Sequence, residues 1–409
     1  IFIKKNMLNI SEIRKQFPSL SLEDDNGNTI IYLDGPGGTQ VPNSVIEGIS
    51  NYYKKSNANT HGEFNTSKKT DILMNSLRDK ASIFLGAENK KCISLGHNMT
   101  TLNFSLARGL SKLFKKGDEV IITDLDHEAN RGPWKTLSEK GIKIKRINVL
   151  ENGILDYDDF ENKINKNTVM IAMGMSSNAI GTVNNFSKIK KLIENKDIIF
   201  LLDAVHYAPH FPIDVRKIGC DILLCSAYKF YGPHIGILYC KLNLLDKLET
   251  DRLIVQDQNA PYRIETGTLN HAACHGVEKA IDFISSLGSG ISLRDKIDDA
   301  YDKLGEHENK LASQLYNSLS RINNIKVIGP DFSTLRTPTV SFVHKSKSAN
   351  EVCKLLGKKN ICAWDGHFYA MKAIQKLGLE ERGGVTRLGV SVYNNEEEIK
   401  NTIKIISGI

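Results

Sequence analysis

A single lysine, Lys229, stands where an apolar run gives way to a turn, in the stretch SAYKFYGPHIG that covers residues 226 to 236. The run before it, CDILLCSAY, is too apolar for a solvated face. We therefore expect Lys229 to leave the end of a buried strand and enter a cleft. Burial disfavours the ammonium form, so the pKa of such a lysine falls and its amine becomes a usable nucleophile. Taken alone, a lysine in this position is more often a surface residue whose stem lies along apolar neighbours.

Two other strand ends deliver polar residues in the same way. LLDAVH (201 to 206) carries Asp203, and DLDHEAN (124 to 130) carries Asp126 and His127. Ligands of parallel α/β sheets bind beyond the carboxyl ends of the strands, so an aspartate and a lysine at two such ends can face one small molecule. That pair suits pyridoxal phosphate, which needs a lysine amine for a Schiff base and an acidic partner for its ring nitrogen. Asp126 competes for the acidic role, and Asp203 could instead cap a helix.

The phosphate of such a cofactor needs donors at a helix N-terminus. GHNMTTLNF (96 to 104) follows a strand and opens a helix, with Asn98, Thr100 and Thr101 as candidate donors. Ser226, which precedes the lysine by three residues, adds another. The glycine run GPGG (35 to 38) lacks the lysine and serine that complete a phosphate loop, so we interpret it as a tight turn.

Short β-rich runs alternate with helix-length segments between about residues 85 and 245. Apolar strands separated by helices predict an α/β fold whose sheet is mostly parallel and covered on both faces. Helices are expected at 102 to 114 and 186 to 196. The predicted strands are 90 to 96, 118 to 125, 143 to 150, 168 to 175, 197 to 204, 220 to 227 and 235 to 241.

The last third of the chain has longer helical patterns and fewer strands, which predicts a smaller α/β domain. We expect three parts: an N-terminal arm at 1–35 that joins the small domain, a large domain at 36–285 and a small domain at 286–409. Helices are expected at 271 to 286, 294 to 321, 348 to 358 and 395 to 407, and strands at 324 to 329, 337 to 343 and within 383 to 393.

Composition excludes some classes of function. The 409 residues are 41% hydrophobic and 25% charged, and no run is long enough to cross a bilayer, so we expect no membrane partner. A net charge of +7, from 54 basic and 47 acidic residues spread along the chain, predicts no nucleic-acid partner. The seven cysteines contain no C-x-x-C pair, which favours reduced core residues and a cytoplasmic location. The N-terminus lacks the pattern of a secretory signal, and Met7 is a candidate first residue.

Seven ordered segments resemble the class V aminotransferase family of fold-type I pyridoxal phosphate enzymes, and within it the cysteine desulfurase-like subgroup. The resemblance covers roughly residues 30 to 405. It implies a large domain with a mainly parallel sheet, a smaller C-terminal α/β domain, and a homodimer. The segments are YLDGPGGTQVP, DHEAN, SSNAIGT, LLDAVH, SAYKFYGPHIG, ETGTLN and TRLGVSVYN.

The resemblance also implies roles for individual residues. Lys229 is the Schiff-base lysine, Asp203 the partner of the pyridine nitrogen and His127 the residue stacked on the ring. Arg387 clamps the substrate carboxylate, a task that suits its planar fork. The other implied cofactor contacts are Asn178 and His206 near the phenolic oxygen, Asn98, Met99, Ser226 and Tyr228 at the phosphate, and Thr268 at the phosphate of the other subunit; His61, Asn65, Asn178 and Tyr369 are implied near the substrate.

The chain departs from the desulfurase pattern at several of these positions. WDGHFYAMK (364 to 372) places Tyr369 where those enzymes carry a sulfur-accepting cysteine, and no cysteine follows Cys362. A tyrosine cannot form a persulfide. His206 and Tyr228 stand where glutamine and histidine are more common, and DGPGG replaces an alanine or serine run. We therefore expect an enzyme that acts on a small amino acid by desulfurase-like or C–S lyase-type elimination, with transamination or epimerisation as the alternative and a silent binding protein as a third reading.

Two histidine pairs have the i, i+4 spacing of helical metal ligands. They are His206 with His210, and His271 with His275. Neither pair brings the further ligands of a zinc site, and a proline interrupts HYAPH, so we expect no metal. Simpler interpretations also remain for other residues: Arg387 pairing with an acid in the small domain, Thr268 capping a turn, His127 as a hydrogen-bonded loop residue and Tyr369 as a packing residue.

Overall fold

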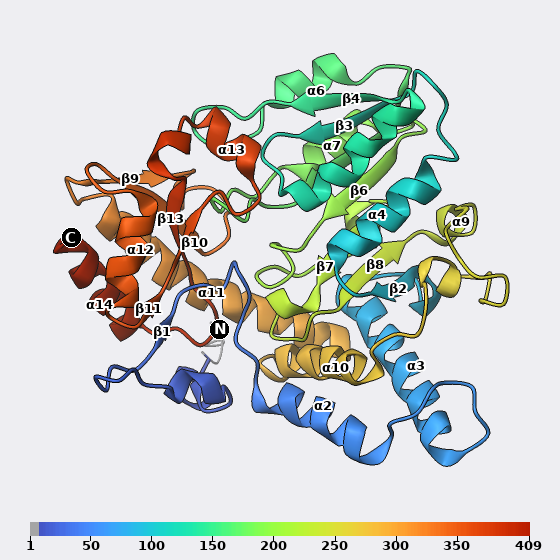
Figure 1. The fold of residues 1–409 in the computed structure, drawn as a ribbon, viewed down its shortest axis with the longest axis horizontal. Helices are drawn as coiled ribbons and strands as arrows, with labels where there is room; N and C mark the ends of the chain where they lie inside the picture. Colours follow the sequence, from blue (N-terminus) through green and yellow to red (C-terminus); the bar gives the residue numbers. More distant parts are fainter. Residues whose placement is uncertain (1–7) are drawn as a thin grey trace, which may run out of the picture.

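The computed structural model describes residues 8–409 and shows a seven-stranded and a four-stranded sheet, each packed against helices, and a small two-stranded sheet (Figure 1). Met7, the candidate first residue, lies outside the described residues. The larger sheet has seven strands in the order β2-β8-β7-β6-β5-β3-β4. All seven strands were predicted from the sequence. Their bounds are β2 Ile93–Gly96, β3 Glu119–Thr123, β4 Lys143–Ile147, β5 Thr168–Gly174, β6 Ile199–Asp203, β7 Ile222–Ser226 and β8 Gly236–Cys240.

The predicted parallel character is confirmed for the five strands from β7 to β4, which all run in the same direction. β8 is antiparallel to both β7 and β2. The reason is local: only the short turn at 227–235 joins β7 to β8, and a parallel return needs a crossover of a dozen or more residues. Asp203 is thus the last residue of β6, and Lys229 follows the end of the neighbouring parallel strand β7.

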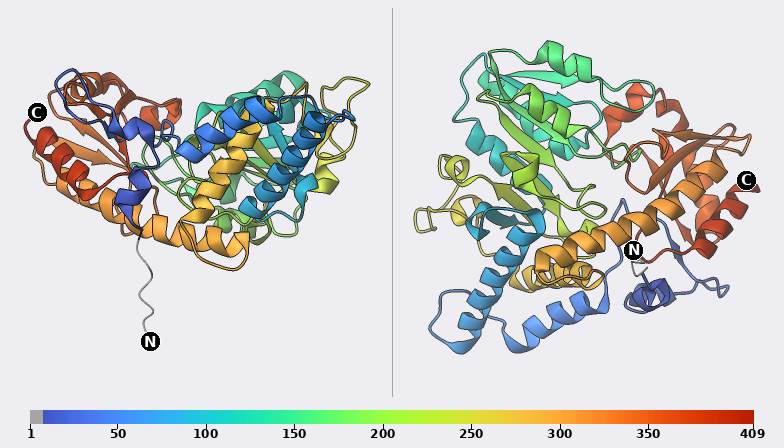
Figure 2. Two further views of the ribbon diagram at one scale, coloured as in Figure 1. Left: turned by 90° about the horizontal axis from the view of Figure 1, so that it is seen from below. Right: turned by 180° about the vertical axis from the view of Figure 1, so that it is seen from behind.

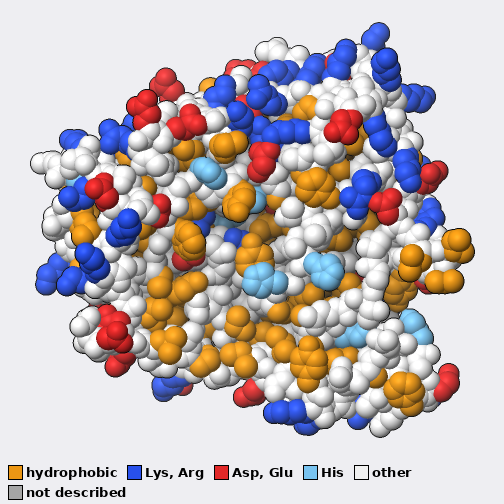
Figure 3. Space-filling model, viewed as in Figure 1, with side chains coloured by type: hydrophobic (Ala, Val, Ile, Leu, Met, Phe, Trp, Pro, Cys, Tyr) orange, Lys and Arg blue, Asp and Glu red, His pale blue; other side chains and the backbone are white. Residues whose placement is uncertain are grey.

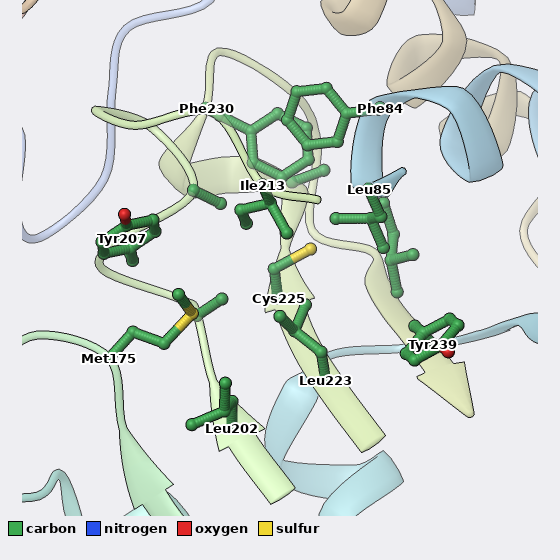
Figure 4. Close-up of a cluster of buried hydrophobic side chains, with 14 of the residues drawn as sticks. Phe84, Leu85, Met175, Leu202, Tyr207, Ile213, Leu223, Cys225, Phe230 and Tyr239 are labelled. Atoms are coloured by element: carbon green, nitrogen blue, oxygen red, sulfur yellow. The ribbon is translucent and has the colours of Figure 1, made fainter. Parts of the chain in front are cut away.

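Successive residues of β7 alternate between two apolar layers on opposite faces of the sheet. Leu223 and Cys225 belong to the cluster that Figure 4 shows, together with Phe84 and Phe230. Ile222 and Leu224 belong to a second cluster. Because both faces are covered, all five residues of β7 are buried, which explains why the strand is a continuous apolar run and does not alternate with polar residues.

Helices form the layers over the two sheets. The long helix α11 extends from the large sheet to the C-terminal part of the chain (Figure 2). A capping box between Ser292 and Asp295 begins it. The helices are α1 Ile10–Arg14, α2 Asn43–Lys55, α3 Asn65–Leu85, α4 Met99–Leu110, α5 Gly132–Lys135, α6 Tyr157–Lys163, α7 Phe186–Leu192, α8 Val215–Ile218, α9 Leu242–Leu245, α10 His271–Ser286, α11 Leu293–Leu319, α12 Ala349–Gly357, α13 Met371–Lys376 and α14 Glu396–Ser407.

The second sheet has the strand order β12-β13-β10-β9. Its strands are β9 Ile325–Ile328, β10 Thr339–His344, β12 Trp364–Gly366 and β13 Val385–Gly389. Near the N-terminus, β1 (Ile31–Tyr32) pairs in parallel with β11 (Ile361–Cys362), and Asp34 forms an isolated bridge to Gly389. The N-terminal segment therefore lies beside β13, although about 350 residues of sequence separate them. The domain boundaries at residues 35 and 285 stay predictions.

Side chains on the surface are mixed in charge. The face in Figure 3 carries basic and acidic residues along its rim and hydrophobic residues and histidines toward its centre. Within residues 8–409, no helix combines the length and apolar character that a bilayer span requires. All seven cysteines are free, as predicted, and five of them are buried.

Candidate active site

Several polar strand ends meet around one cavity at the carboxyl edge of the large sheet. Its volume is about 470 Å³. Lys229 ends a 3₁₀ turn, Ala227–Lys229, that directly follows β7, and Asp203 is the last residue of β6. Eleven of the residues predicted for the site line this cavity: Asn98, Met99, Thr100, Thr101, His127, Asn178, Asp203, His206, Ser226, Tyr228 and Lys229.

Lys229 is buried, with 8% of its surface exposed, so it is not a surface residue with a solvated amine. Nζ donates hydrogen bonds to the carbonyl oxygens of Pro36 and Gly37, the latter at 3.0 Å. Nζ also lies 4.9 Å from the centre of the Tyr228 ring. Burial, followed by the positive charge of Arg387, lowers the pKa of Lys229 from 10.5 to about 7. Near neutral pH a large fraction of this amine is therefore unprotonated.

Asp203 is the buried carboxylate that faces the cavity. One of its oxygens accepts a hydrogen bond from the Val205 amide at 2.9 Å. Burial, with repulsion from Asp126, raises the pKa of Asp203 to about 7, while Lys229 acts in the opposite direction. A carboxyl in this condition can exchange a proton with a bound partner near neutral pH.

Asp126, the alternative candidate for the acidic role, makes hydrogen bonds that stabilise the fold. Its oxygens accept hydrogen bonds from the Thr123 hydroxyl at 2.7 Å, the Gly174 amide at 2.9 Å and the Asn130 side chain at 3.0 Å. These bonds tie the segment after β3 to the end of β5, and Asp126 does not line the cavity. The geometry thus favours Asp203 for the acidic role.

His127 lies between the cavity and the loop that contains Tyr369. Its Nδ1 accepts a hydrogen bond from the Ala129 amide at 3.0 Å, so the ring proton of the neutral form sits on Nε2. Burial and the charge of Lys229 lower the pKa of His127 to about 4. The His127 ring is therefore neutral and can stack on a planar ligand. The Tyr369 ring lies 5.2 Å away with 31° between the two ring planes.

The loop beside His127 has an unusual backbone. Phe368 and Tyr369 are consecutive non-glycine residues with positive φ angles of 49° and 58°, a conformation that costs free energy for residues with a Cβ atom. The Phe368 carbonyl accepts from the Asn178 side chain at 2.9 Å, and the Tyr369 carbonyl accepts from the Glu128 amide at 2.8 Å. These bonds hold the loop, and the Tyr369 side chain stays 68% exposed at the edge of the site.

Helix α4 begins at the predicted phosphate-binding segment. Asn98 caps it by accepting from the Thr101 amide at 2.9 Å, and the Ser226 hydroxyl accepts from the Met99 amide at 3.0 Å. Gly236 permits this arrangement because a Cβ there would lie 2.5 Å from the Asn98 carbonyl carbon. The result is a positive helix end that opens into the cavity.

His206 and Asn178 present polar atoms without partners. The His206 Nε2 lies 3.1 Å from the Thr337 hydroxyl and 3.0 Å from that of Thr339, whereas its Nδ1 is buried and unpaired. Asn178 likewise has a buried Oδ1 without a partner. Burial lowers the pKa of His206 well below its usual value, so its ring is neutral. His210 binds Glu308 at 2.8 Å, and residues 8–409 contain no group of three or more side chains placed to hold a metal ion.

Arg387 pairs with an acid, but this acid is Asp34 of the N-terminal segment and not a residue of the predicted small domain. Its Nη2 lies 2.9 Å from Asp34 Oδ1, and its Nη1 donates to the Asn178 carbonyl at 3.0 Å. The guanidinium carbon lies 3.9 Å from the centre of the Phe368 ring. Sequence reasoning missed Asp34, Pro36, Gly37 and Phe368 as neighbours of the site. The unusual DGPGG run was the available signal for the first three.

Three predicted residues lie elsewhere. His61 and Thr268 line a second cavity of about 450 Å³ that Lys229 does not reach. Asn65 is the first residue of α3 and lines neither cavity. A buried ion pair between Arg78 and Glu265, at 2.7 Å, borders the second cavity. Within one chain, His61 and Thr268 are thus separate from the residues around Lys229, and Asn65 belongs to neither group.

The sequence matches the family model described as Aminotransferase class-V over residues 31–402. The chain belongs to the class V aminotransferase family. Among its relatives in this family, a probable cysteine desulfurase of Borreliella burgdorferi is 30% identical, with 98% of this chain and 96% of that protein covered. A cysteine desulfurase of Wigglesworthia glossinidia brevipalpis is 31% identical, with 97% and 96% covered.

Solved structures support the same placement for this class V aminotransferase family member. An apo structure of a cysteine desulfurase from Thermococcus onnurineus superposes with a TM-score of 0.87 at 26% identity, and the match covers 97% of both chains. The chain is therefore a cysteine desulfurase-like enzyme of the class V family, and its fold is that of these structural neighbours.

Proposed function

We propose that this enzyme binds pyridoxal 5'-phosphate through Lys229 and acts on a small amino acid. The observation that carries the proposal is the placement of Lys229 and Asp203 on neighbouring parallel strand ends, at one cavity, with pKa values both moved to about 7. A silent binding protein gains little from a buried lysine beside buried acids, because burying such groups costs free energy.

The residues around the cavity fit the cofactor. The N-terminus of α4, with Asn98, Met99, Ser226 and Tyr228 nearby, offers donors for a phosphate. The unpaired His206 Nδ1 and Asn178 Oδ1 are buried polar atoms that a bound polar group would satisfy. Asp203 would pair with the ring nitrogen, and His127 would cover the ring.

When bound, the cofactor supplies an aldehyde that links to the Lys229 amine and a ring that accepts electrons from the bonds of the substrate α-carbon. The protein supplies the proton handling. Because its pKa is near 7, Lys229 can act as a nucleophile in its neutral form and then take up and return the α-proton. The Asp203 carboxylate would stabilise a proton on the ring nitrogen of the cofactor, and the neutral His127 ring would place no further positive charge beside it.

We propose elimination at the side chain of a cysteine-like substrate, with cleavage of a C–S bond, as the reaction. The curated relatives that share this family are named for cysteine desulfurization. Tyr369 has no thiol to accept sulfur, so the sulfur would leave as free sulfide or pass to an external acceptor. Transamination or epimerisation uses the same first proton transfer and is the alternative that a product screen separates.

A homodimer forms part of the proposal. Thr268 and His61 line a cavity separate from Lys229, and a second copy would bring them to the partner's site. Leu253, Ile254 and Val255 border that region with exposed fractions of 66%, 99% and 91%, an apolar run that favours burial against another subunit. The free cysteines support a cytoplasmic location.

The test of cofactor binding is spectroscopic. Purified protein incubated with pyridoxal phosphate should show a visible absorbance band that borohydride removes, and peptide mapping should find the label on Lys229. Lys229→Ala should abolish the band, whereas Lys217→Ala, which changes an exposed lysine, should not. A label on another lysine, or no band at all, would contradict the proposal.

The reaction is tested by product analysis. We expect sulfide together with pyruvate and ammonia when L-cysteine is supplied, which is the outcome of elimination. Alanine would instead accompany transfer of the sulfur, as sulfane sulfur, to an external thiol. Oxo-acid formation from the amino acid without sulfide would favour transamination, and change of configuration at the α-carbon would favour epimerisation.

A further inference from the structure

The DGPGG turn, residues 34–38, contacts both of the buried cations of the site. Its first residue, Asp34, pairs with Arg387, and the carbonyls of Pro36 and Gly37 accept from Lys229. Asp34 and Arg387 are 6% and 3% exposed. Arg387, which the family resemblance implies as the binder of the substrate carboxylate, therefore already has a carboxylate from the chain as its partner.

Arg387 is only partly occupied by these contacts. A guanidinium has five N–H donors. The structure assigns one bond to the Asn178 carbonyl and one to Asp34, while Nε is buried without any partner. The stacked Phe368 ring covers one face of the guanidinium. Donors thus remain for a second carboxylate, but that carboxylate would have to approach close to Asp34.

The position of Asp34 is fixed by its backbone. The Gly389 amide donates to the Leu33 carbonyl at 2.7 Å, and residue 34 bridges to Gly389 in β13, the strand that carries Arg387. The turn is also tightly packed, because a Cβ at Gly37 would lie 2.2 Å from Asp34 Oδ2. Asp34 and Arg387 therefore cannot separate without a change in side-chain conformation or in this strand pairing.

We propose that Asp34 is a specificity-determining residue that shares Arg387 with the substrate carboxylate and weakens the binding of that carboxylate. This inference rests on the proposed function in one respect, namely that Arg387 faces the acid group of the substrate. Two carboxylates at one buried guanidinium repel each other, so Arg387 contributes less affinity than an unpaired arginine would. Most of the binding free energy then comes from the amino group and the side chain of the substrate.

The experiment compares L-alanine with L-alaninamide, which lacks the carboxylate. Each compound is titrated into the full-length protein with pyridoxal phosphate, and the Kd is obtained from the rise in unfolding temperature with ligand concentration. Asp34→Asn keeps the shape of the side chain but removes its charge. We expect it to bind L-alanine at least about tenfold more tightly than the wild type, because one repelling carboxylate is gone, with little change for L-alaninamide.

Three further variants make the result decisive. Asp25→Asn removes an exposed carboxylate of the same segment and should change neither Kd. Asp34→Ser provides a second charge-free variant if the asparagine form does not unfold cooperatively. In the double variant Asp34→Asn with Arg387→Gln, the gain for L-alanine should vanish, which would show that it acts through Arg387.

Unchanged or weaker binding of L-alanine by folded Asp34→Asn and Asp34→Ser would overturn the inference, since Asp34 would then orient Arg387 without competing. An equal gain for L-alaninamide would overturn it as well. Failure of the proposed function gives a different result. The borohydride-sensitive absorbance band would then be absent, whereas the titrations with L-alanine and L-alaninamide would still report binding at Arg387.

Discussion

The pH dependence of Lys229 is the most direct quantitative test of the site. An ordinary lysine amine, with a pKa of 10.5, is about 0.03% neutral at pH 7, whereas a pKa of about 7 makes half of it neutral. Burial in the cavity is the main cause, and the charge of Arg387 adds to it. At pH 7 the amine should therefore react with an aldehyde on the order of a thousandfold faster than if it were solvated, when the reactivity of the neutral form is the same.

The assay follows the initial rate of the visible absorbance change when pyridoxal phosphate is added at a series of pH values from about 5.5 to 10. We expect the rate to rise with a midpoint near pH 7. Arg387→Gln removes a positive charge that lowers the pKa of Lys229 and should move the midpoint up. Asp34→Asn removes a negative charge that raises this pKa and should move the midpoint down.

These opposite directions separate electrostatics from general disruption of the site. A wild-type midpoint above about pH 9 would refute the reasoning, because it would mean that the amine is solvated or that its hydrogen bonds to Pro36 and Gly37 outweigh burial. Shifts of the same sign in both variants would also refute it, since the two residues carry opposite charges.

Further predictions concern stability and chemistry. The pKa of Lys229 is lower in the folded chain than the usual 10.5, so the unfolded chain binds more protons between about pH 7 and 10.5. The free energy of unfolding should therefore rise with pH across this window. In urea titrations, Lys229→Met should flatten this rise. Asp203→Asn should keep the borohydride-trapped label but lower kcat by about 10² or more, because the ring nitrogen loses its acidic partner; unchanged turnover would exclude that role. Leu223→Ala, in the cluster of Figure 4, should lower the free energy of unfolding by about 2–5 kcal/mol. Tyr369→Cys should take sulfur directly from L-cysteine as a persulfide on the new thiol, with alanine as the other product, and so retain cyanide-releasable sulfur. The wild type should release sulfide with pyruvate and ammonia; equal retention in both would place the acceptor elsewhere.

Local patterns in the sequence were enough to predict the seven strands of the large sheet. The strands of the large sheet are apolar on both faces because helices cover both, so they stand out as continuous hydrophobic runs, and β7 is the clearest case. Lys229 is the charged residue that follows the continuous hydrophobic run of β7, and this contrast is why it could be identified from the sequence as a candidate site residue. The helix expected at 102 to 114 begins three residues earlier, at Met99, because Asn98 caps it there.

Other features depend on contacts between distant parts of the chain. Sequence spacing could not decide between Asp126 and Asp203, because both follow apolar strands. The decision came from the Thr123, Gly174 and Asn130 donors that occupy Asp126. Similarly, β1 and β11 were not predicted, because each consists of two residues that pair only when the chain is folded.

The sequence by itself determined the class of fold, the candidate lysine Lys229 and the chemistry that a lysine and an aspartate at neighbouring strand ends allow. Only the tertiary structure decided that Arg387 already has a carboxylate partner, because Asp34 is 353 residues away along the chain. It also separated His61 and Thr268 from Lys229. The physical reason is that strand and helix patterns arise from neighbours in the sequence, whereas the charge environment of a buried group depends on every segment that folds against it.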